Sequence, residues 1–333
     1  MYVIKKLNWK FRLALGGFLA LFGPAASSAE EACLVAPSIP THLMDADSVS
    51  DYRPALRVCR AEGRENIAIR TMTLAGEPVL LLADPQSLTT RLERAACWTC
   101  KDATDEELAE TRLLRAVEAS AAAPGLVHRG FLENAGLTHG GSSGAYLTGD
   151  LCPSKRPLDR AFLEELATQE ERPPIALSIS GLWLLHHFAD YQWLLRRQAE
   201  GAFEITWVDH SYHHQFHRGA PNDRNFLLTP GVDPDAEILD TERLLIANGQ
   251  TPSLFFRFPG LISSAPLMQA VRRHHLVSLG ADAWLALGQK PGEGSIILVH
   301  PNGNEEIGLA MFNRNLARGA IAQPFEPLIA APD

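Results

Sequence analysis

Long apolar runs, basic residues and cysteine are all scarce in this chain of 333 residues. The apolar run near the N-terminus, residues 13–22, has about half of the ~20 residues that a membrane-spanning helix needs. Lysine and arginine number 30 against 39 aspartate and glutamate, which gives a formal net charge of −9. Nucleic acids and anionic membranes bind proteins largely through lysine and arginine. We therefore expect no nucleic-acid partner and a neutral or basic substrate.

The chain has five cysteines: Cys33, Cys59, Cys97, Cys100 and Cys152. A zinc ribbon needs two closely spaced cysteine pairs, and only Cys97 and Cys100 form such a pair. No strand-then-helix pattern of thioredoxin type surrounds that pair, so a structural disulfide is favoured over a periplasmic thiol oxidoreductase. Although spacing alone does not determine connectivity, we expect disulfides Cys33–Cys59 and Cys97–Cys100, with Cys152 free.

The first 29 residues differ in composition from the rest of the chain. Basic residues come first, an apolar run at 13–22 follows, and small residues at 27–29 end the segment. This order is typical of a secretory signal peptide, although an uncleaved membrane anchor is the alternative. Cleavage would remove four positive charges and leave a formal net charge of −13. We expect an exported protein, periplasmic or extracellular, with no stable membrane anchor after cleavage.

Residues 30–140 are expected to form a smaller α+β region of unknown role. This region contains one clear strand-like run, at 78–83, and one helical segment, at 105–122, which begins with acidic residues. A glycine- and serine-rich stretch at 139–144 is predicted to be a flexible connector. No motif in the region indicates a particular chemistry.

In residues 141–325, apolar runs of strand length alternate with segments of helical character. The predicted strands are 145–148, 175–179, 203–208, 254–258, 276–279 and 296–299. The predicted helices are 158–168, 190–200, 235–248, 266–275 and 305–318. This alternation predicts an α/β fold with a parallel sheet covered on both faces, and both a barrel and a doubly wound sheet fit it.

Ionisable residues follow most of the predicted strands. The residues at these positions are Asp150, Gly181, His210, Arg257, Asp282 and His300. In α/β barrels the loops at the carboxyl ends of the strands meet on one face and carry the functional site. Although strands often end in polar residues, two aspartates, two histidines and an arginine indicate a chemical site.

The densest signal is the stretch Asp-His-Ser-Tyr-His-His at residues 209–214. His210 and His214 are four residues apart, so on a helical turn they face the same way. This spacing suits two imidazole ligands of one divalent metal. His213 and His217 have the same spacing, so the pairing is not unique, and a solvated histidine-rich loop is the alternative.

Four stretches, taken in order over residues 145–303, resemble the motifs of the polysaccharide deacetylase family, which has the NodB-homology fold. In that family the motifs read Thr-Phe-Asp-Asp-Gly-Pro, His-Ser/Thr-x-x-His, Arg-x-Pro and an apolar strand ending in His. The matching residues here are Tyr146-Leu147-Thr148-Gly149-Asp150 with Pro153; His210, Ser211 and His214; Arg257-Phe258-Pro259-Gly260; and Ile297-Leu298-Val299-His300.

This resemblance implies a distorted parallel (β/α) barrel with one divalent metal, zinc being the expected ion. In the family two histidines and an aspartate bind the metal, which lowers the pKa of the attacking water and polarises an N-acetyl carbonyl. An aspartate acts as base and a histidine protonates the leaving amine. Carried over, His210 and His214 bind the metal, Asp150 is the base, Arg257 orients Asp150, and His300 is the acid.

One departure from the family pattern concerns the metal. Leu151 stands where the family has its second aspartate, the metal ligand. Either Asp150 becomes the ligand, or the two histidines bind the metal with a different third group. Cys152 is a candidate for that group, because thiolate binds zinc well.

A second departure concerns the fourth family motif, in which aspartate directly precedes tryptophan. Here Ala283 separates Asp282 from Trp284. Asp282 is still expected to orient Arg257 or His300. The expected substrate contacts are Trp284, Tyr212 and Asn302.

The sequence therefore predicts an exported, metal-dependent hydrolase that removes N-acetyl groups from an amino-sugar polymer of the cell envelope. The substrate class is a polysaccharide or a peptidoglycan-like glycan. The alternative is a catalytically inactive carbohydrate-binding protein on the same fold, which the loss of the aspartate at Leu151 favours.

Overall fold

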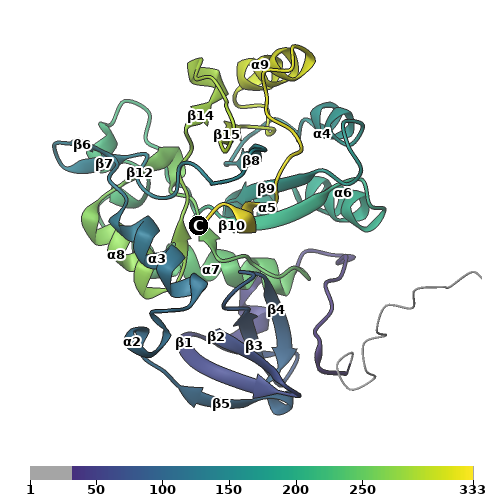
Figure 1. Ribbon diagram of the computed structural model, residues 1–333, viewed down its shortest axis with the longest axis vertical. Helices are drawn as coiled ribbons and strands as arrows, with labels where there is room; N and C mark the ends of the chain where they lie inside the picture. The colour runs from purple at the N-terminus through teal and green to yellow at the C-terminus, as the bar shows by residue number, and fades with distance from the viewer. Residues whose placement is uncertain (1–31, 333) are drawn as a thin grey trace, which may run out of the picture. The chain divides into compact units, whose positions relative to one another are not determined.

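The computed structural model describes residues 32–332 (Figure 1). The predicted signal peptide, residues 1–29, lies outside the described residues. Leu34–Asp333 forms one compact unit. Within the described range, none of the helices is both long and apolar enough to cross a membrane. The domain boundaries expected at residues 29, 140 and 325 stay predictions.

A five-stranded antiparallel sheet occupies the first part of this unit, with strand order β4-β3-β2-β1-β5. Its strands are β1 Val49–Ala61, β2 Arg64–Leu74, β3 Glu77–Ala83, β4 Thr90–Arg94 and β5 Thr99–Asp102. The predicted strand at 78–83 is β3, whose last five residues are buried. The sequence analysis missed β1 because most of its side chains are exposed or half-buried, which gives a weak hydrophobic pattern.

One disulfide joins two neighbouring strands of this sheet. β1 and β5 pair with Cys59 opposite Cys100, the Cα atoms are 4.0 Å apart, and the two residues are bonded. The expected pairs Cys33–Cys59 and Cys97–Cys100 are therefore wrong, because the antiparallel register places a different partner within bonding distance of Cys59. Cys33 and Cys97 are also disulfide-bonded, and Cys152 is free, as predicted.

The single helix predicted at 105–122 is two helices, α2 Asp105–Leu108 and α3 Arg112–Ala122. The break falls at Thr111, whose side chain caps α3 by accepting a hydrogen bond from Leu114 N. α3 packs against the edge strand β13, Val277–Ser278, and against helix α8, Ala265–Arg273, which lies beside it in Figure 1. Residues before 141 therefore pack against one edge of the main sheet.

Two further segments of the first region are bonded to the later part of the chain. Strand β7, Phe131–Glu133, pairs with β6, Leu126–His128, and with β12, Ile262–Ser263. The stretch 139–144, expected to be a free connector, is hydrogen-bonded instead, since Gly140 N donates to Gly294 O at 2.8 Å.

The main sheet has seven parallel strands in the order β13-β11-β10-β9-β8-β15-β14. The strands are β8 Tyr146–Leu151, β9 Pro174–Ile179, β10 Glu204–Asp209, β11 Phe255–Phe256, β13 Val277–Ser278, β14 Ala283–Trp284 and β15 Ile296–Val299. All six predicted strands are present. The seventh, β14, has two residues, too few to show an apolar run.

The connection between the two edge strands shows that this sheet curves into a distorted barrel. Only residues 279–282 link β13 to β14, and such a link spans at most about 18 Å. In a flat sheet of seven strands the edges would lie about 29 Å apart. The sheet therefore bends until its edges approach, which confirms the predicted parallel (β/α) barrel over a doubly wound sheet.

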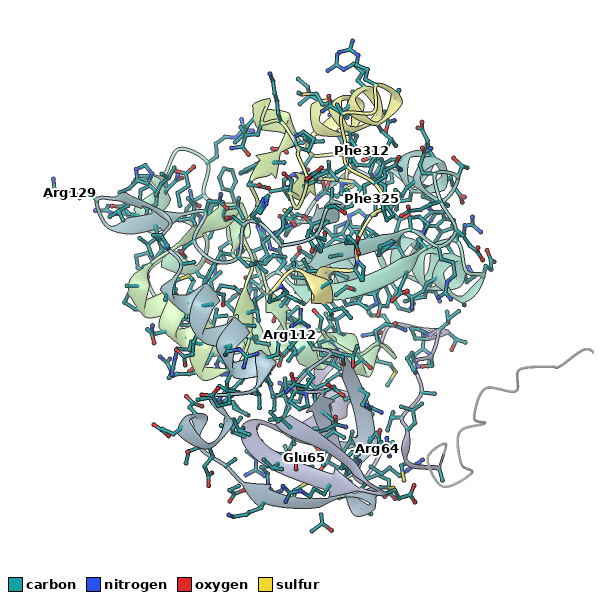
Figure 2. All side chains as sticks on the ribbon, in the orientation of Figure 1. Arg64, Glu65, Arg112, Arg129, Phe312 and Phe325 are labelled. Carbon is teal, nitrogen blue, oxygen red and sulfur yellow. A yellow bond between two sulfur atoms is a disulfide. The ribbon has the colours of Figure 1, made fainter. Side chains whose placement is uncertain are left out.

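Six helices surround these strands: α4 Arg160–Leu166, α5 Gly181–His186, α6 Phe188–Ala199, α7 Pro234–Ala247, α8 Ala265–Arg273 and α9 Glu306–Ala317. Figure 1 shows α4, α6, α8 and α9 around the outside of the strands. The five predicted helices are all present, and α5 was missed. Figure 2 labels Phe312 of α9 and Phe325 of the C-terminal segment, whose stacked rings are 6.0 Å apart and fix α9 against the core.

A buried ion pair joins the antiparallel sheet to helix α7. The Arg70 guanidinium donates to both carboxylate oxygens of Glu242, at 2.7 and 2.8 Å, and both side chains are almost completely buried. Tyr52 also donates to Glu242, at 2.7 Å. Burial lowers the pKa of Arg70, whereas Glu242 raises it. The resulting pKa lies above the usual value, so the guanidinium stays charged.

Candidate metal and catalytic site

Four polar side chains meet at the carboxyl ends of neighbouring parallel strands. Asp150 is the penultimate residue of β8, and His210, Arg257 and His300 stand directly after β10, β11 and β15. All four side chains are buried. The carboxyl ends of the strands are where α/β barrels place their functional residues. The sequence motifs at these positions therefore converge in space.

Arg257 holds Asp150 in place. Its Nη1 atom donates to Asp150 Oδ1 at 2.8 Å and to Thr148 Oγ1 at 2.7 Å, and its Nη2 atom donates to Gly280 O at 2.9 Å. Thr148 and Asp150 are two residues apart on β8, so they project to the same face of the sheet. The second carboxylate oxygen of Asp150, Oδ2, remains directed at the two histidines.

The electrostatic surroundings keep Asp150 ionised. Burial raises the pKa of the Asp150 carboxyl, but Arg257, His210 and His300 together lower that pKa well below its usual range. His210 Nε2 lies 3.6 Å and His300 Nε2 4.0 Å from Asp150 Oδ2. A carboxylate so surrounded carries its negative charge at neutral pH.

Cys152, His210 and His214 form a cluster of potential metal ligands beside Asp150. Their donor atoms all lie within 4.8 Å of one another, and all three residues are buried. The Cys152 sulfur is 3.5 Å from His210 Nε2, and the two imidazole rings are 4.8 Å apart. Burial raises the pKa of the Cys152 thiol, but the two histidines lower that pKa well below its usual range.

The backbone of the histidine loop differs from the predicted helical turn. Ser211 and His214 have positive φ angles of 69° and 47°, and the stretch lies outside the helices. Glu237 of α7 holds the loop, since Ser211 Oγ and His213 N both donate to its Oε2 atom. The tight loop turn, rather than a helical spacing, brings His210 and His214 together.

The structure of this loop shows which pair, His210 and His214 or His213 and His217, belongs to the cluster. His213 Nδ1 lies 2.7 Å from Glu237 Oε1, so His213 faces α7, and about half of its side chain is exposed. His217 does not belong to the group of metal-binding side chains found in the described residues. His210 and His214 are therefore the pair that points to the site.

His300 has a partner that the sequence analysis did not assign. Glu305 Oε2 lies 2.8 Å from His300 Nδ1 and accepts a hydrogen bond from Trp284 Nε1 at 2.9 Å. Burial lowers the pKa of His300, but Cys152, Glu305 and Asp150 raise it well above its usual value. Burial raises the pKa of Glu305, while His300 and Trp284 lower it below the usual value. No spacing pattern identifies this pair, because a loop turn brings Glu305 back onto His300.

For the N-acetyl hydrolysis that the family resemblance implies, we expect Glu305→Gln to lower kcat by about tenfold with KM little changed. Glutamine has the same size but carries no charge, so it weakens the orientation of His300 without removing the implied proton donor, whose loss would cost at least about 10²-fold. Steady-state kinetics on the folded variant measures this. Glu306→Gln is the matched control, because Glu306 is exposed and pairs with Arg156. An unchanged kcat in Glu305→Gln would contradict the prediction.

The structure does not bring Asp282 to the cluster. Asp282 Oδ1 accepts a hydrogen bond from Ile296 N at 2.9 Å, and Asp282 Oδ2 lies 2.7 Å from His139 Nδ1. These contacts are at the amino end of β15, whereas His300 follows its carboxyl end. Asp282 therefore contacts neither Arg257 nor His300, contrary to the expectation, because the extra residue before Trp284 leaves it at the wrong end of the strand.

Of the three expected substrate contacts, only Trp284 lines the cavity over the cluster. The Tyr212 ring packs against Gly181 of α5, where a Cβ atom would lie 2.5 Å from the ring. Asn302 is fully buried, and its Nδ2 atom donates to Cys152 O at 2.9 Å. Asn302 therefore positions Cys152 and has no exposed surface with which to contact a substrate.

The cavity itself has a volume of about 320 Å³, within the range of small-molecule sites. Its polar lining includes Cys152, His214, His300 and Glu305, and its aromatic lining comprises Phe216, Phe226 and Trp284. Phe216 is 63% exposed and its ring stacks on Phe226. Aromatic faces beside a few polar groups suit a flat, partly apolar ligand such as a sugar ring.

The solved structures that this chain resembles include family 4 carbohydrate esterases. A family 4 carbohydrate esterase from Bacillus anthracis matches at 18% identity and a TM-score of 0.41, over 59% of this chain and 86% of its own. The chain resembles the family 4 carbohydrate esterases. One from Bacillus subtilis matches at 16% identity and a TM-score of 0.41, over 58% of this chain and 82% of its own. A family 4 pseudoenzyme from Bacillus anthracis matches at 15% identity and a TM-score of 0.37, over 55% of this chain and 64% of its own.

No family model matches the chain. Because all three TM-scores are below 0.5 and all three identities are below 25%, this likeness assigns no activity to the chain. The residues of the site are what bear on function.

Proposed function

We propose that this protein is an exported, metal-dependent carbohydrate deacetylase that removes N-acetyl groups from an amino-sugar polymer of the cell envelope. The observation that carries the proposal is the arrangement around Asp150: an ionised carboxylate held by Arg257, with His210 on one side and His300 on the other. This arrangement supplies a base, an acid and potential metal ligands within one site.

The residues present fit a divalent metal. His214 Nε2 is buried and has no hydrogen-bond partner in the described part of the chain, which leaves its lone pair or proton unused. His210 Nδ1 lies 2.8 Å from Arg257 O, and a carbonyl oxygen can only accept. The proton of a neutral His210 is therefore on Nδ1, and Nε2 is available as a ligand. A metal bound at His210 and His214 would lower the pKa of the attacking water and polarise the acetyl carbonyl.

The protein side chains would then handle two protons. Asp150, whose Oδ1 is taken by Arg257, accepts the proton of the attacking water at Oδ2 as water adds to the acetyl carbon. His300, charged through its neighbours, gives its Nε2 proton to the sugar nitrogen as the C–N bond breaks. Acetate and a free amine are the products. Arg257 orients Asp150, and Glu305 orients His300.

Charge and cavity lining support the proposed substrate class. The exposed aromatic ring of Phe216, which lines the same cavity as the polar side chains, favours a glycan. The negatively charged protein does not repel a neutral N-acetylated polymer. It attracts the basic amine product only weakly, because salt screens its surface charge. A polysaccharide or a peptidoglycan-like polymer is the substrate we infer.

The test is acetate release by the purified mature chain, supplied with zinc, from N-acetylglucosamine oligosaccharides and from purified peptidoglycan. We expect release that depends on added metal and disappears in His300→Asn. Glycan binding without acetate release would favour a catalytically inactive carbohydrate-binding protein. Neither binding nor release on any N-acetylated glycan would overturn the proposal.

A further inference from the structure

We propose that Cys152 is the third protein ligand of a divalent-metal site with His210 and His214. The inference deepens the proposed function, on which any catalytic role of the metal rests. The ligand set itself follows from the geometry of three side chains and is tested without a substrate.

The distance between Cys152 and His210 matches that between two ligands of one tetrahedral ion. Zinc binds sulfur at about 2.3 Å and imidazole nitrogen at about 2.0 Å, so the sulfur and nitrogen ligands of one zinc lie about 3.5 Å apart. Cys152 Sγ and His210 Nε2 are 3.5 Å apart, and all three donor atoms are within 4.8 Å of one another. The three atoms therefore converge on a single small volume.

Two further observations support these side chains as a ligand set. His214 is nine-tenths buried, yet its Nε2 atom has no hydrogen-bond partner among the described residues. An unpaired buried polar atom destabilises the folded state unless a ligand satisfies it. The His210 ring is fixed by Arg257 O, and the backbone carbonyl of Cys152 is fixed by Asn302, so both ligands have supporting contacts.

The position of Leu151 explains why the third ligand comes from the next residue. Leu151 is fully buried in the apolar core between the sheet and its helices, with Ile179 and Trp183. Because side chains alternate along a strand, Asp150 and Cys152 share the opposite face. Arg257 holds one carboxylate oxygen of Asp150, and among the described residues the donor atoms that lie within 4.8 Å of one another belong to Cys152, His210 and His214, so Cys152 is the donor from that face.

The redox state of the cysteines is consistent with this role. Cys33, Cys59, Cys97 and Cys100 are all disulfide-bonded, and Cys152 is the remaining free thiol. A set of one thiolate and two imidazoles selects zinc or cobalt over magnesium and calcium, which require oxygen ligands. Three protein ligands leave a fourth position open, as in catalytic zinc sites.

Cobalt spectroscopy on the full mature chain tests the ligand set directly. We expect one equivalent of Co²⁺ to give the intense near-ultraviolet band of thiolate-to-cobalt charge transfer. Cys152→Ser should lose this band and bind Zn²⁺ at least about 100-fold more weakly, a larger loss than removal of a supporting contact causes. Cys152→Asp, which supplies a carboxylate at the same position, should bind Co²⁺ without the band.

A second measurement covers the case in which a variant folds poorly. In the unmodified protein, alkylation of the free thiol should be fast after chelation and blocked by one equivalent of Zn²⁺, and the block should be lost in His214→Ala. Absence of the charge-transfer band, or equal Zn²⁺ affinity in the parent and Cys152→Ser, would overturn the inference. If the thiolate bound the metal but the protein released no acetate, only the proposed function would be contradicted.

Discussion

Asp150→Asn will lower kcat for N-acetyl hydrolysis by about 10²- to 10⁴-fold, the usual contribution of a general base. Asparagine has nearly the same shape but cannot accept a proton from water at neutral pH. It also leaves the buried guanidinium of Arg257 without its carboxylate, so we expect a loss of stability as well. Kinetics must therefore be normalised to the folded fraction, measured by circular dichroism.

The informative control for this variant is Asp282→Asn. The resemblance to the deacetylase family assigns Asp282 an orienting role, but its hydrogen bonds are with Ile296 N and Ser295 Oγ at the other end of β15. We expect Asp282→Asn to keep kcat near the parent value. If Asp282→Asn lost as much activity as Asp150→Asn, the position of Asp282 in the structure would be contradicted.

Leu151→Asp will destabilise the protein rather than restore a metal ligand. The Leu151 side chain lies fully buried in the core, on the face opposite Asp150. Removal of a buried leucine side chain alone lowers the free energy of unfolding by about 2–5 kcal/mol, and an unpaired buried carboxylate adds to that loss. We expect a decrease of more than about 3 kcal/mol, measured by urea denaturation.

Leu151→Met is the matched control, because a swap that conserves volume changes stability by less than about 1.5 kcal/mol. Metal content should be the same in the parent and in Leu151→Met. A folded Leu151→Asp protein that gains metal relative to the parent would show that β8 can rotate its side chains. The assignment of Cys152 as ligand would then be unnecessary.

The main sheet was largely predictable because its strands are buried on both faces. Such strands are continuous apolar runs, and β9, for example, has five buried residues in succession. β14 could not be predicted, because its two residues are a strand only through pairing with β15. β1 was missed for the opposite reason, since much of that antiparallel strand stays exposed.

The sequence indicated the site residues only where those residues stand at the ends of strands. Asp150, His210, Arg257 and His300 follow apolar runs, so their convergence follows from the barrel topology. Glu305 was not predictable as the partner of His300, because loop conformation decides which side chain turns back onto the imidazole. The expected disulfide pairs were wrong for a related reason, since antiparallel register, which spacing does not reveal, determines which cysteines face each other.

The buried ion pair of Arg70 and Glu242 limits how this chain can be truncated or fused. A truncated chain that starts after residue 140 would lose the guanidinium that neutralises the Glu242 carboxylate and the Tyr52 hydroxyl that donates to it. It would also expose the surfaces of β13 and α8 that α3 covers. We therefore expect a fusion, truncation or domain swap of the parallel barrel to need the antiparallel sheet as well.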